Sequence, residues 1–176
     1  MGATEILIRR ASVEDAEVLA EFGARLFEET FGAANDPDDM RIYLTGAFSP
    51  ALQMAELVDP NKAVWFATDE HNELIGYTIM RRGSRGPGVG GGETAEVQRI
   101  YADGRWQGRG VGRRLMDQCI EQARAWGADV LWLAVWEENP RAIAFYERTG
   151  FTKVGVTTFV LGRDIQHDLV MSLPLR

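Results

Sequence analysis

The stretch QGRGVGRR, residues 107–114, combines residue types that suit phosphate binding. Glycine lacks a Cβ, so glycines in a turn before a helix let an anion approach the backbone closely. The first N–H groups of a helix have no partner inside it and carry partial positive charge. The arginines that follow the last glycine add full charges. The stretch therefore predicts a pyrophosphate seat, whose contacts are Gln107, Gly108, Arg109, Gly110, Val111, Gly112 and Arg113.

Two other phosphate motifs do not fit this stretch. A P-loop needs a lysine followed by serine or threonine after its second glycine, whereas Arg113 and Arg114 follow Gly112. A dinucleotide-binding glycine motif opens the first strand–helix–strand unit of its domain, whereas these glycines lie late in the chain. The residues alone leave one alternative open, namely that the glycines only let a helix pack closely on a strand.

A helix must follow the seat, and strands must flank it. Apolar residues recur at every fourth position from Val111 to Ala123, which predicts an amphipathic helix that ends near Gly127. The segment 93–102 has a strand pattern, and the apolar run 130–136 is typical of a strand buried on both faces. Strand, helix and strand in this order predict a parallel pair joined by a right-handed crossover.

The rest of the chain indicates further strands and helices. Strands are expected at residues 6–10, 63–68, 73–80, 151–160 and 167–173. Helices are expected at residues 12–30, from Pro37 onward, from Pro50 to about 59, and from Pro140 to 149. The glycine-rich segment 83–92 is expected to be a flexible connection, and it is no phosphate loop because it leads into a strand.

Composition and charge exclude several classes of protein. We expect a single domain over residues 1–176. The net charge of −7 argues against general affinity for nucleic acid. No apolar run approaches the ~20 residues that cross a bilayer, and residues 1–10 lack the apolar core of a secretion signal, so we expect no membrane attachment and a cytoplasmic location. One cysteine and two distant histidines predict no metal site.

Residues 95–151 closely resemble the acetyl-CoA-binding core of the GNAT superfamily of N-acetyltransferases. The family signature Q/R-x-x-G-x-G/A matches residues 107–112, with Gly112 in its last place. A second similar element follows at the expected interval, as Asn139, Ala142, Ala144-Phe145-Tyr146 and Gly150-Phe151. Two elements in the right order are more specific than either alone. Residues 30–57 are also similar to the corresponding stretch of the PaiA type of spermidine/spermine acetyltransferases.

The resemblance implies an α/β fold with a mixed, mostly antiparallel sheet of about six or seven strands, a splayed parallel pair in its middle and flanking helices. It implies acetyl-CoA as co-substrate and no metal. The coenzyme's pantetheine arm is expected along residues 98–102, with contacts at Arg99, Ile100 and Tyr101. Asn139 and Ala142 are implied as further coenzyme contacts, although an asparagine before a proline equally suits a helix cap.

Acetyl transfer to an amine needs an acid and a base. By the resemblance, Tyr146 contacts the coenzyme and is the general acid, since a phenol with a pKa of ~10 holds a proton that it can pass to a thiolate. An alkylammonium has a pKa near ~10.4, so it must lose a proton first. Glu96 is a candidate base, directly or through ordered water, and an exposed strand carboxylate without that role is an equal alternative. Cys119 lies in the apolar helical stripe, which favours direct transfer over an acyl-cysteine.

Acidic residues gather near the first helical connection, a region that usually borders the acceptor in GNAT folds. We expect Glu28, Glu29 and Asp36 to bind the substrate, while helix caps and solvated faces are the competing interpretation. Trp136 lies in a strand-like run and is expected in the core.

The expected function is acetyl transfer to a primary amine of a small molecule, with polyamines such as spermidine or spermine first. Acetylation of a protein N-terminus or lysine is one alternative, and a non-catalytic acyl-CoA sensor is another. An open sheet edge allows a homodimer without requiring one.

Overall fold

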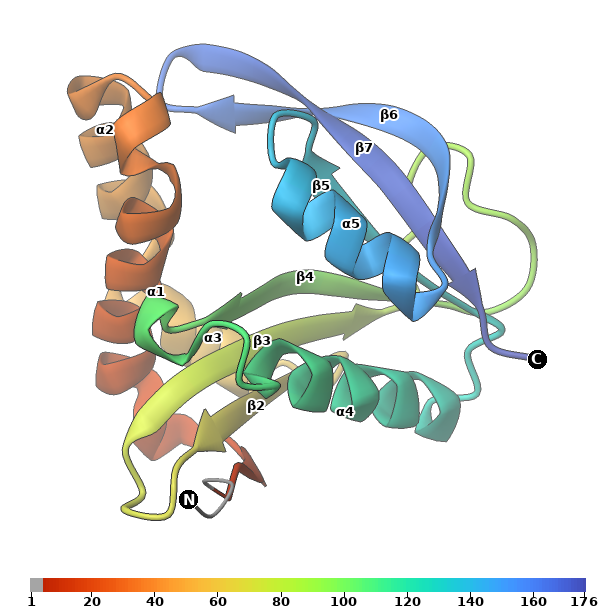
Figure 1. The fold of residues 1–176 in the computed structure, drawn as a ribbon, viewed down its shortest axis with the longest axis horizontal. Helices are drawn as coiled ribbons and strands as arrows, with labels where there is room; N and C mark the ends of the chain where they lie inside the picture. The colour runs from red at the N-terminus through yellow and green to blue at the C-terminus, as the bar shows by residue number, and fades with distance from the viewer. Residues whose placement is uncertain (1–4) are drawn as a thin grey trace.

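The computed structural model describes residues 5–176, whose strands form one seven-stranded sheet in the order β1-β2-β3-β4-β5-β7-β6 (Figure 1). The strands are β1 Leu7–Arg10, β2 Lys62–Thr68, β3 Leu74–Arg82, β4 Thr94–Ala102, β5 Val130–Trp136, β6 Thr152–Leu161 and β7 Asp164–Pro174. Neighbouring strands are antiparallel except β4 and β5, which pair in parallel at the centre. The predicted mixed sheet with a central parallel pair is confirmed.

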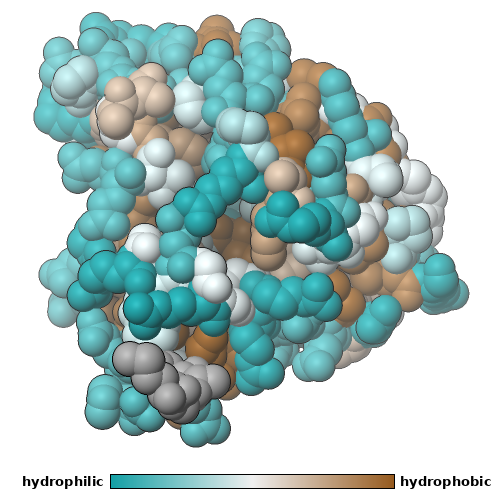
Figure 2. All heavy atoms as spheres, viewed as in Figure 1, coloured by the Kyte–Doolittle hydropathy of each residue, from teal (hydrophilic) through white to brown (hydrophobic). Residues whose placement is uncertain are grey.

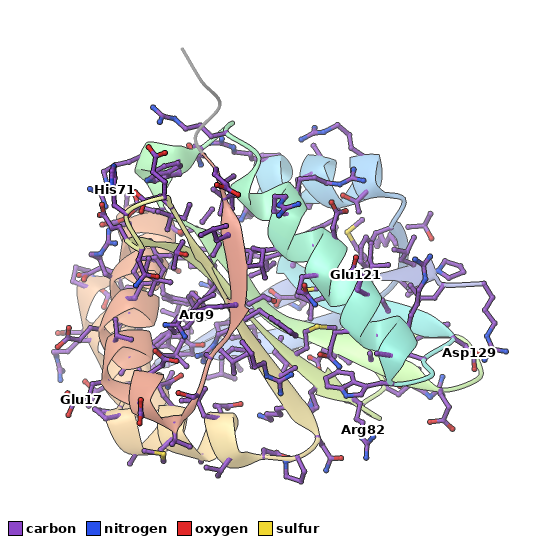
Figure 3. The ribbon with its side chains drawn as sticks, turned by 90° about the horizontal axis from the view of Figure 1, so that it is seen from below. Arg9, Glu17, His71, Arg82, Glu121 and Asp129 are labelled. Atoms are coloured by element: carbon purple, nitrogen blue, oxygen red, sulfur yellow. The ribbon has the colours of Figure 1, made fainter. Side chains whose placement is uncertain are left out.

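Helices cover both faces of the sheet. They are α1 Ala16–Phe31, α2 Pro37–Ala47, α3 Pro50–Val58, α4 Val111–Ala125 and α5 Pro140–Thr149. In Figure 3, α1 with Glu17 lies on one side of the sheet and α4 with Glu121 on the other. In Figure 1, α5 lies in front of β5 and β7, on the same side of the sheet as α4. The flanking helices implied by the family resemblance are therefore present.

The helices begin where the sequence predicts. Prolines occupy the first turns of α2, α3 and α5, where no backbone N–H is needed. The preceding Asp36, Ser49 and Asn139 accept hydrogen bonds from N–H groups of those first turns. Helix α5 ends at Gly150, whose φ of 106° suits glycine.

The central parallel pair separates partway along its length. Only residues 94–97 of β4 pair with residues 130–133 of β5, although both strands continue, to Ala102 and Trp136. A register irregularity between Ile79 and Met80 bends β4 against β3 at the same level. Beyond this point the two strands diverge, so the edge of β4 that faces β5 is free of strand partners.

The α4 helix is anchored firmly on the sheet. Its residues Leu115, Met116 and Cys119 are fully buried. Gly76 of β3 allows this approach, because a Cβ at that position would lie 2.9 Å from the Val111 side chain. Tight packing here fixes the position of the helix N-terminus, which follows the glycine-rich turn.

Residues 83–92 connect β3 to β4 without helix or strand, as their glycine content predicts. The segment packs against the sheet, since Val89 is buried with Trp132 and Val170. Trp132 Nε1 donates a hydrogen bond of 2.9 Å to the Ser84 carbonyl. The flexibility expected for this segment remains a prediction.

Asp103 joins the end of β4 to the turn that carries the glycines. Its carboxylate is 1% exposed and accepts hydrogen bonds from the Arg25 guanidinium at 3.0 Å and the Arg105 guanidinium at 2.9 Å. Hydrogen bonds from Arg105, with that from Arg25 and their positive charges, hold the pKa of this carboxyl well below its usual range. The carboxylate thereby ties α1 to the turn.

We predict that Asp103→Asn lowers the free energy of unfolding at neutral pH by about 1–2 kcal/mol, since charged hydrogen bonds are lost from a buried site. Because the folded-state pKa is depressed, the wild-type advantage is present above the unfolded value of about 4 and is lost as the pH falls below it. Urea unfolding at several pH values measures this. Glu29→Gln, which removes the exposed carboxylate that pairs with the same Arg25, is the control and should have less effect.

Candidate active site

A cavity of about 740 Å³ opens where β4 and β5 diverge. Its walls come from β4 and β5, the glycine-rich turn, α5 and the C-terminal end of α1, with single residues of α2, α3 and β3 and residues of β6 and β7. Figure 2 shows apolar surface in a recess near the middle of the viewed face, bordered by hydrophilic side chains. The cavity thus reaches from the N-terminus of α4, through the gap between the strands, to the helices on the other face.

The glycine-rich turn leaves backbone donors free. Gly108 and Gly110 have φ values of 75° and 89°, which a residue with a side chain rarely adopts. The N–H groups that donate to no other of residues 5–176 are those of Gly108, Gly110, Val111, Gly112 and Arg113. They lie at the start of α4, and this arrangement suits an anion.

Two of the predicted seat residues do not offer their amides. The N–H of Gln107 donates to the Gly104 carbonyl at 3.2 Å, and that of Arg109 donates to the Trp106 carbonyl at 3.2 Å. These bonds close the short 3-10 turn Gly104–Trp106 ahead of the glycines. Gln107 and Arg109, predicted as contacts of the pyrophosphate, therefore cannot offer their backbone N–H groups to it in this conformation.

Space above the turn is open. A Cβ built on Gly108 or Gly110 meets nothing within 4 Å, and one on Gly112 meets only the Phe145 ring, at 3.6 Å. Glycines needed only for close helix–strand packing would have backbone or core atoms at that distance. The packing alternative therefore does not account for Gly108 and Gly110.

The arginines near the turn make different contacts. Arg113 lines the cavity and pairs with Asp117 at 2.8 Å. Arg109 lies over the Trp106 ring, 5.3 Å from its centroid, and is not in the cavity lining. Arg114 donates to the Ile6 carbonyl at 3.3 Å. Two further arginines line the cavity, Arg141 and Arg148 of α5, and no motif in the sequence indicates them.

The free edge of β4 faces the same cavity. Arg99, Ile100 and Tyr101 all contribute to its lining, and their contact with a pantetheine arm remains a prediction. On the β3 side Ile100 pairs with Thr78, while the β5 side has no strand partner at this level. Unpaired backbone groups of an edge strand bind an extended ligand readily.

Helix α5 brings Tyr146 and Asn139 to the cavity. Tyr146 is 9% exposed, and burial raises the pKa of its phenol well above the ordinary value of 10. Its hydroxyl therefore holds a proton throughout the neutral pH range. Asn139 also lines the cavity, and its Oδ1 accepts the Ala142 N–H at 3.2 Å, so its capping role is observed and a coenzyme contact remains a prediction.

Cys119 is absent from the cavity lining and fully buried. Burial raises the pKa of its thiol to about 12, and the sulfur lies 3.3 Å from the Thr78 hydroxyl. A buried neutral thiol is a poor nucleophile. The interpretation of Cys119 as a small buried hydrophobe agrees with this position.

The far end of the cavity is aromatic and acidic. Phe31, Tyr43, Trp136 and Phe159 line it, together with the carboxylate of Asp168, which is opposite Trp136, and the guanidinium of Arg99 beside Tyr43. Glu56 and Glu96 also line the cavity, but Glu96 lies in the paired part of β4, opposite Trp132. Trp136, expected in the core, is instead partly exposed here and packs edge-on against Phe31 at 6.0 Å between ring centroids.

The acidic residues predicted to bind substrate lie elsewhere. Glu28 is exposed, Glu29 pairs with Arg25 at 2.9 Å, and Asp36 caps α2, and none of the three lines the cavity. Helix phase explains this, because Phe27 and Phe31 occupy the inward face of α1 and leave Glu28 and Glu29 on the outward face. The structure does not bring these three carboxylates to the site.

Glu96 does lie in the cavity wall, but its carboxylate is engaged. Its Oε2 accepts hydrogen bonds from the Arg81 guanidinium at 2.8 Å and from the Ser84 hydroxyl at 2.7 Å. These bonds fix the position of the carboxylate against Arg81 and Ser84. The other oxygen of the group, Oε1, accepts no hydrogen bond from residues 5–176.

Among residues 5–176, no three His, Cys, Asp or Glu side chains are placed together to hold a metal ion. No helix in this part of the chain is both long and apolar enough to cross a bilayer.

Comparison with known proteins places these features in a family. The model of the acetyltransferase (GNAT) family matches residues 23–151. An uncharacterized N-acetyltransferase of Lactobacillus delbrueckii subsp. lactis is 30% identical over 98% of this chain and 99% of its own. The N-alpha-acetyltransferase RimI of Mycobacterium tuberculosis is 32% identical over 81% of this chain and 75% of its own.

A solved structure has the same fold. The PaiA N-acetyltransferase of Thermoplasma acidophilum, crystallised with coenzyme A, superposes with a TM-score of 0.78 at 20% identity, covering 97% of this chain and 99% of its own. The splayed strands, the glycine turn with free amides and the family match agree with one another. This chain belongs to the acetyltransferase (GNAT) family and is an N-acetyltransferase that uses acetyl-CoA.

Proposed function

We propose that the acceptor is a small molecule with a primary alkylamine, and that polyamines such as spermidine or spermine are its first candidates. The observation that carries this proposal is the aromatic and acidic far end of the cavity. Aromatic faces and carboxylates both attract alkylammonium groups. The N-terminal stretch that resembles PaiA-type enzymes supplies the wall residues Phe31 and Tyr43.

The residues around the glycine turn fit the coenzyme. Five free N–H groups, the open space over Gly108 and Gly110, and the side chain of Arg113 suit its pyrophosphate. The unpaired edge of β4 at residues 98–102 suits its pantetheine arm. When bound, acetyl-CoA supplies an acetyl thioester whose carbonyl carbon is open to attack by an amine.

Tyr146 and Glu96 are the proposed acid and base. Tyr146 donates its hydroxyl proton to the departing thiolate, and its raised pKa keeps that proton available. A backbone N–H near Ile100 or Tyr101 polarises the thioester carbonyl. Glu96 accepts the amine proton through its free Oε1, directly or through ordered water, while Arg81 holds the carboxylate in place.

Acetylation of a protein N-terminus is the second candidate. Its support is the 32% identity to the N-alpha-acetyltransferase RimI. A sensor that binds acyl-CoA without turnover would not need a buried tyrosine hydroxyl in the cavity, so the position of Tyr146 argues against it. The cytoplasmic location, the homodimer and the absence of nucleic-acid binding remain predictions.

Release of free thiol from acetyl-CoA separates the candidates. Purified protein is incubated with spermidine, spermine, simple diamines, free amino acids, and peptides with a free N-terminus or a free lysine. Turnover is expected with the small amines. Turnover confined to peptides would favour the second candidate, and coenzyme binding without turnover on any amine would favour the sensor.

We predict that Tyr146→Phe lowers kcat by roughly 100-fold or more, because general acid catalysis typically contributes that much. The KM for acetyl-CoA should change little, since the ring and its packing are kept. Steady-state kinetics measure both constants. An unchanged kcat in a folded variant would remove Tyr146 from its role.

We predict that Gly110→Asp weakens coenzyme binding by about tenfold more than Gly110→Asn does. Both side chains meet the same φ of 89°, so their backbone strain is matched and only the negative charge beside the seat differs. Titration calorimetry with coenzyme A measures the affinities. Equal affinities in the two variants would contradict a phosphate seat at this turn.

A further inference from the structure

Asp168 of β7 is a buried carboxylate that the steps above do not use. Its residue is 9% exposed and lines the cavity. Its Oδ1 is buried and has no hydrogen-bond partner among residues 5–176. Of the other acids in the lining, Glu56 pairs with Lys62 and Glu96 pairs with Arg81. Asp168 has no such cation within hydrogen-bonding distance in the described chain.

The sheet register fixes where this carboxylate faces. Asp168 is directly opposite Trp136 on β5 and Thr157 on β6. Directly paired residues of antiparallel strands project to the same face, so Asp168 shares the face of Trp136. Trp136 packs against Phe31 of α1, which also lines the cavity. Asp168 therefore points to the aromatic end of the cavity.

An unpaired buried carboxylate lowers the stability of a fold unless a bound ligand supplies the missing cation. Phe31, Trp136 and Phe159 offer ring faces and edges, and Arg99, which lines the same cavity, lies over the Phe48 ring and forms no ion pair with Asp168 in the described chain. An ammonium group would satisfy the carboxylate and could rest against those rings. From this geometry we propose that Asp168 binds a second, non-reacting ammonium of the acceptor. The inference rests on the proposed function and narrows its acceptor to diamines and polyamines.

The choice of a non-reacting ammonium follows from two facts. A carboxylate bound to the reacting nitrogen would favour its protonated form, which cannot attack. Trp136, opposite Asp168, is three residues beyond Leu133, the last β5 residue paired with β4. At about 3.3 Å per residue, Asp168 lies roughly 10 Å along the strands from the point where they part. Glu96, the proposed base, lies in the paired part of the strands, so it is separated along the sheet from Asp168, and an acceptor that reaches both carboxylates needs two amines joined by an alkyl chain.

The charges around Asp168 set how its binding depends on pH. Burial, with Glu137 just after β5, raises the pKa of its carboxyl to about 6. Its strand partners Trp136 and Thr157 carry no charge. The other charged residues that line the cavity are Glu56, Glu96, Arg99, Arg113, Arg141 and Arg148. The raised pKa means that Asp168 loses its negative charge, and with it the ammonium, as the pH falls through about 6.

The test compares 1,6-diaminohexane with hexylamine, which has the same chain and no second charge. Wild-type protein should prefer the diamine in kcat/KM. Asp168→Asn, of equal size and no charge, should lose about tenfold or more of that preference while its rate with hexylamine and its KM for acetyl-CoA change little. Asp168→Glu keeps the charge and should retain more of the preference than Asp168→Asn.

A pH series gives a second readout. The wild-type preference should decline from about pH 8 to about pH 5, and Asp168→Asn should show no such decline. The control Glu137→Gln, at an exposed position outside the cavity lining, should keep the preference at about pH 8 and shift its midpoint to lower pH, because a neighbouring negative charge is removed.

An unchanged diamine preference in Asp168→Asn, or equal loss with both amines, would overturn the inference. Thermal melting of the unliganded protein tests whether Asp168→Asn is folded. The substitution removes an unpaired buried charge, so the melting temperature at about pH 8 should be equal to that of the wild type or higher. If the wild type acetylates neither amine, the proposed function itself fails, which the wild-type arm alone reveals.

Discussion

The separation of β4 from β5 is the constraint on which the rest of the structure depends. Parallel strands normally continue their hydrogen bonds along their common length, but here only residues 94–97 and 130–133 pair. The divergence leaves one edge of β4 without partners and opens the cavity between the two faces of the sheet. Because α4 is packed tightly on β3 and β4, the free amides at its N-terminus stay fixed relative to that edge. The free amides and the unpaired edge of β4 are thereby held at fixed positions along one cavity.

The gap also separates two electrostatic environments. On the side of the glycine turn, the cavity is lined by Arg113, Arg141 and Arg148 with free backbone N–H groups, which suits a polyanionic coenzyme. At the far end it is lined by aromatic rings, by Arg99 beside Tyr43, and by Asp168, which lacks a cation partner in the described chain. The arginine-lined side therefore suits an anion and the unpaired Asp168 suits a cation, and Tyr146 on α5 lies in the wall of the same cavity.

Sequence patterns predicted the elements and the coenzyme side of the site better than the acceptor side. The glycine motif is local, so its turn, its helix and Gly112 were found without tertiary information. The aromatic end of the cavity is assembled from α1, α2 and three strands that are distant from one another in the chain. In the sequence, Asp168 looks like an ordinary polar residue of an alternating strand. Its position in the cavity follows only from the pairing of β7 with β5, which puts it opposite Trp136. Glu28 and Glu29 were misplaced even though the inward phase of Phe27 and Phe31 was visible in the sequence.

A buried carboxylate without a cation is a stability cost that the fold retains. The same strand position would accept asparagine or an apolar residue with less desolvation. Burial raises the pKa of Asp168 to about 6, so near neutral pH the group is still mostly ionised and ready to bind a cation. A lower pKa, as Arg25 and Arg105 produce at Asp103, would mean that protein charges already satisfy the carboxylate. Asp103, paired with two arginines, stabilises the fold, whereas Asp168, without a cation partner in the described chain, is suited to bind a ligand.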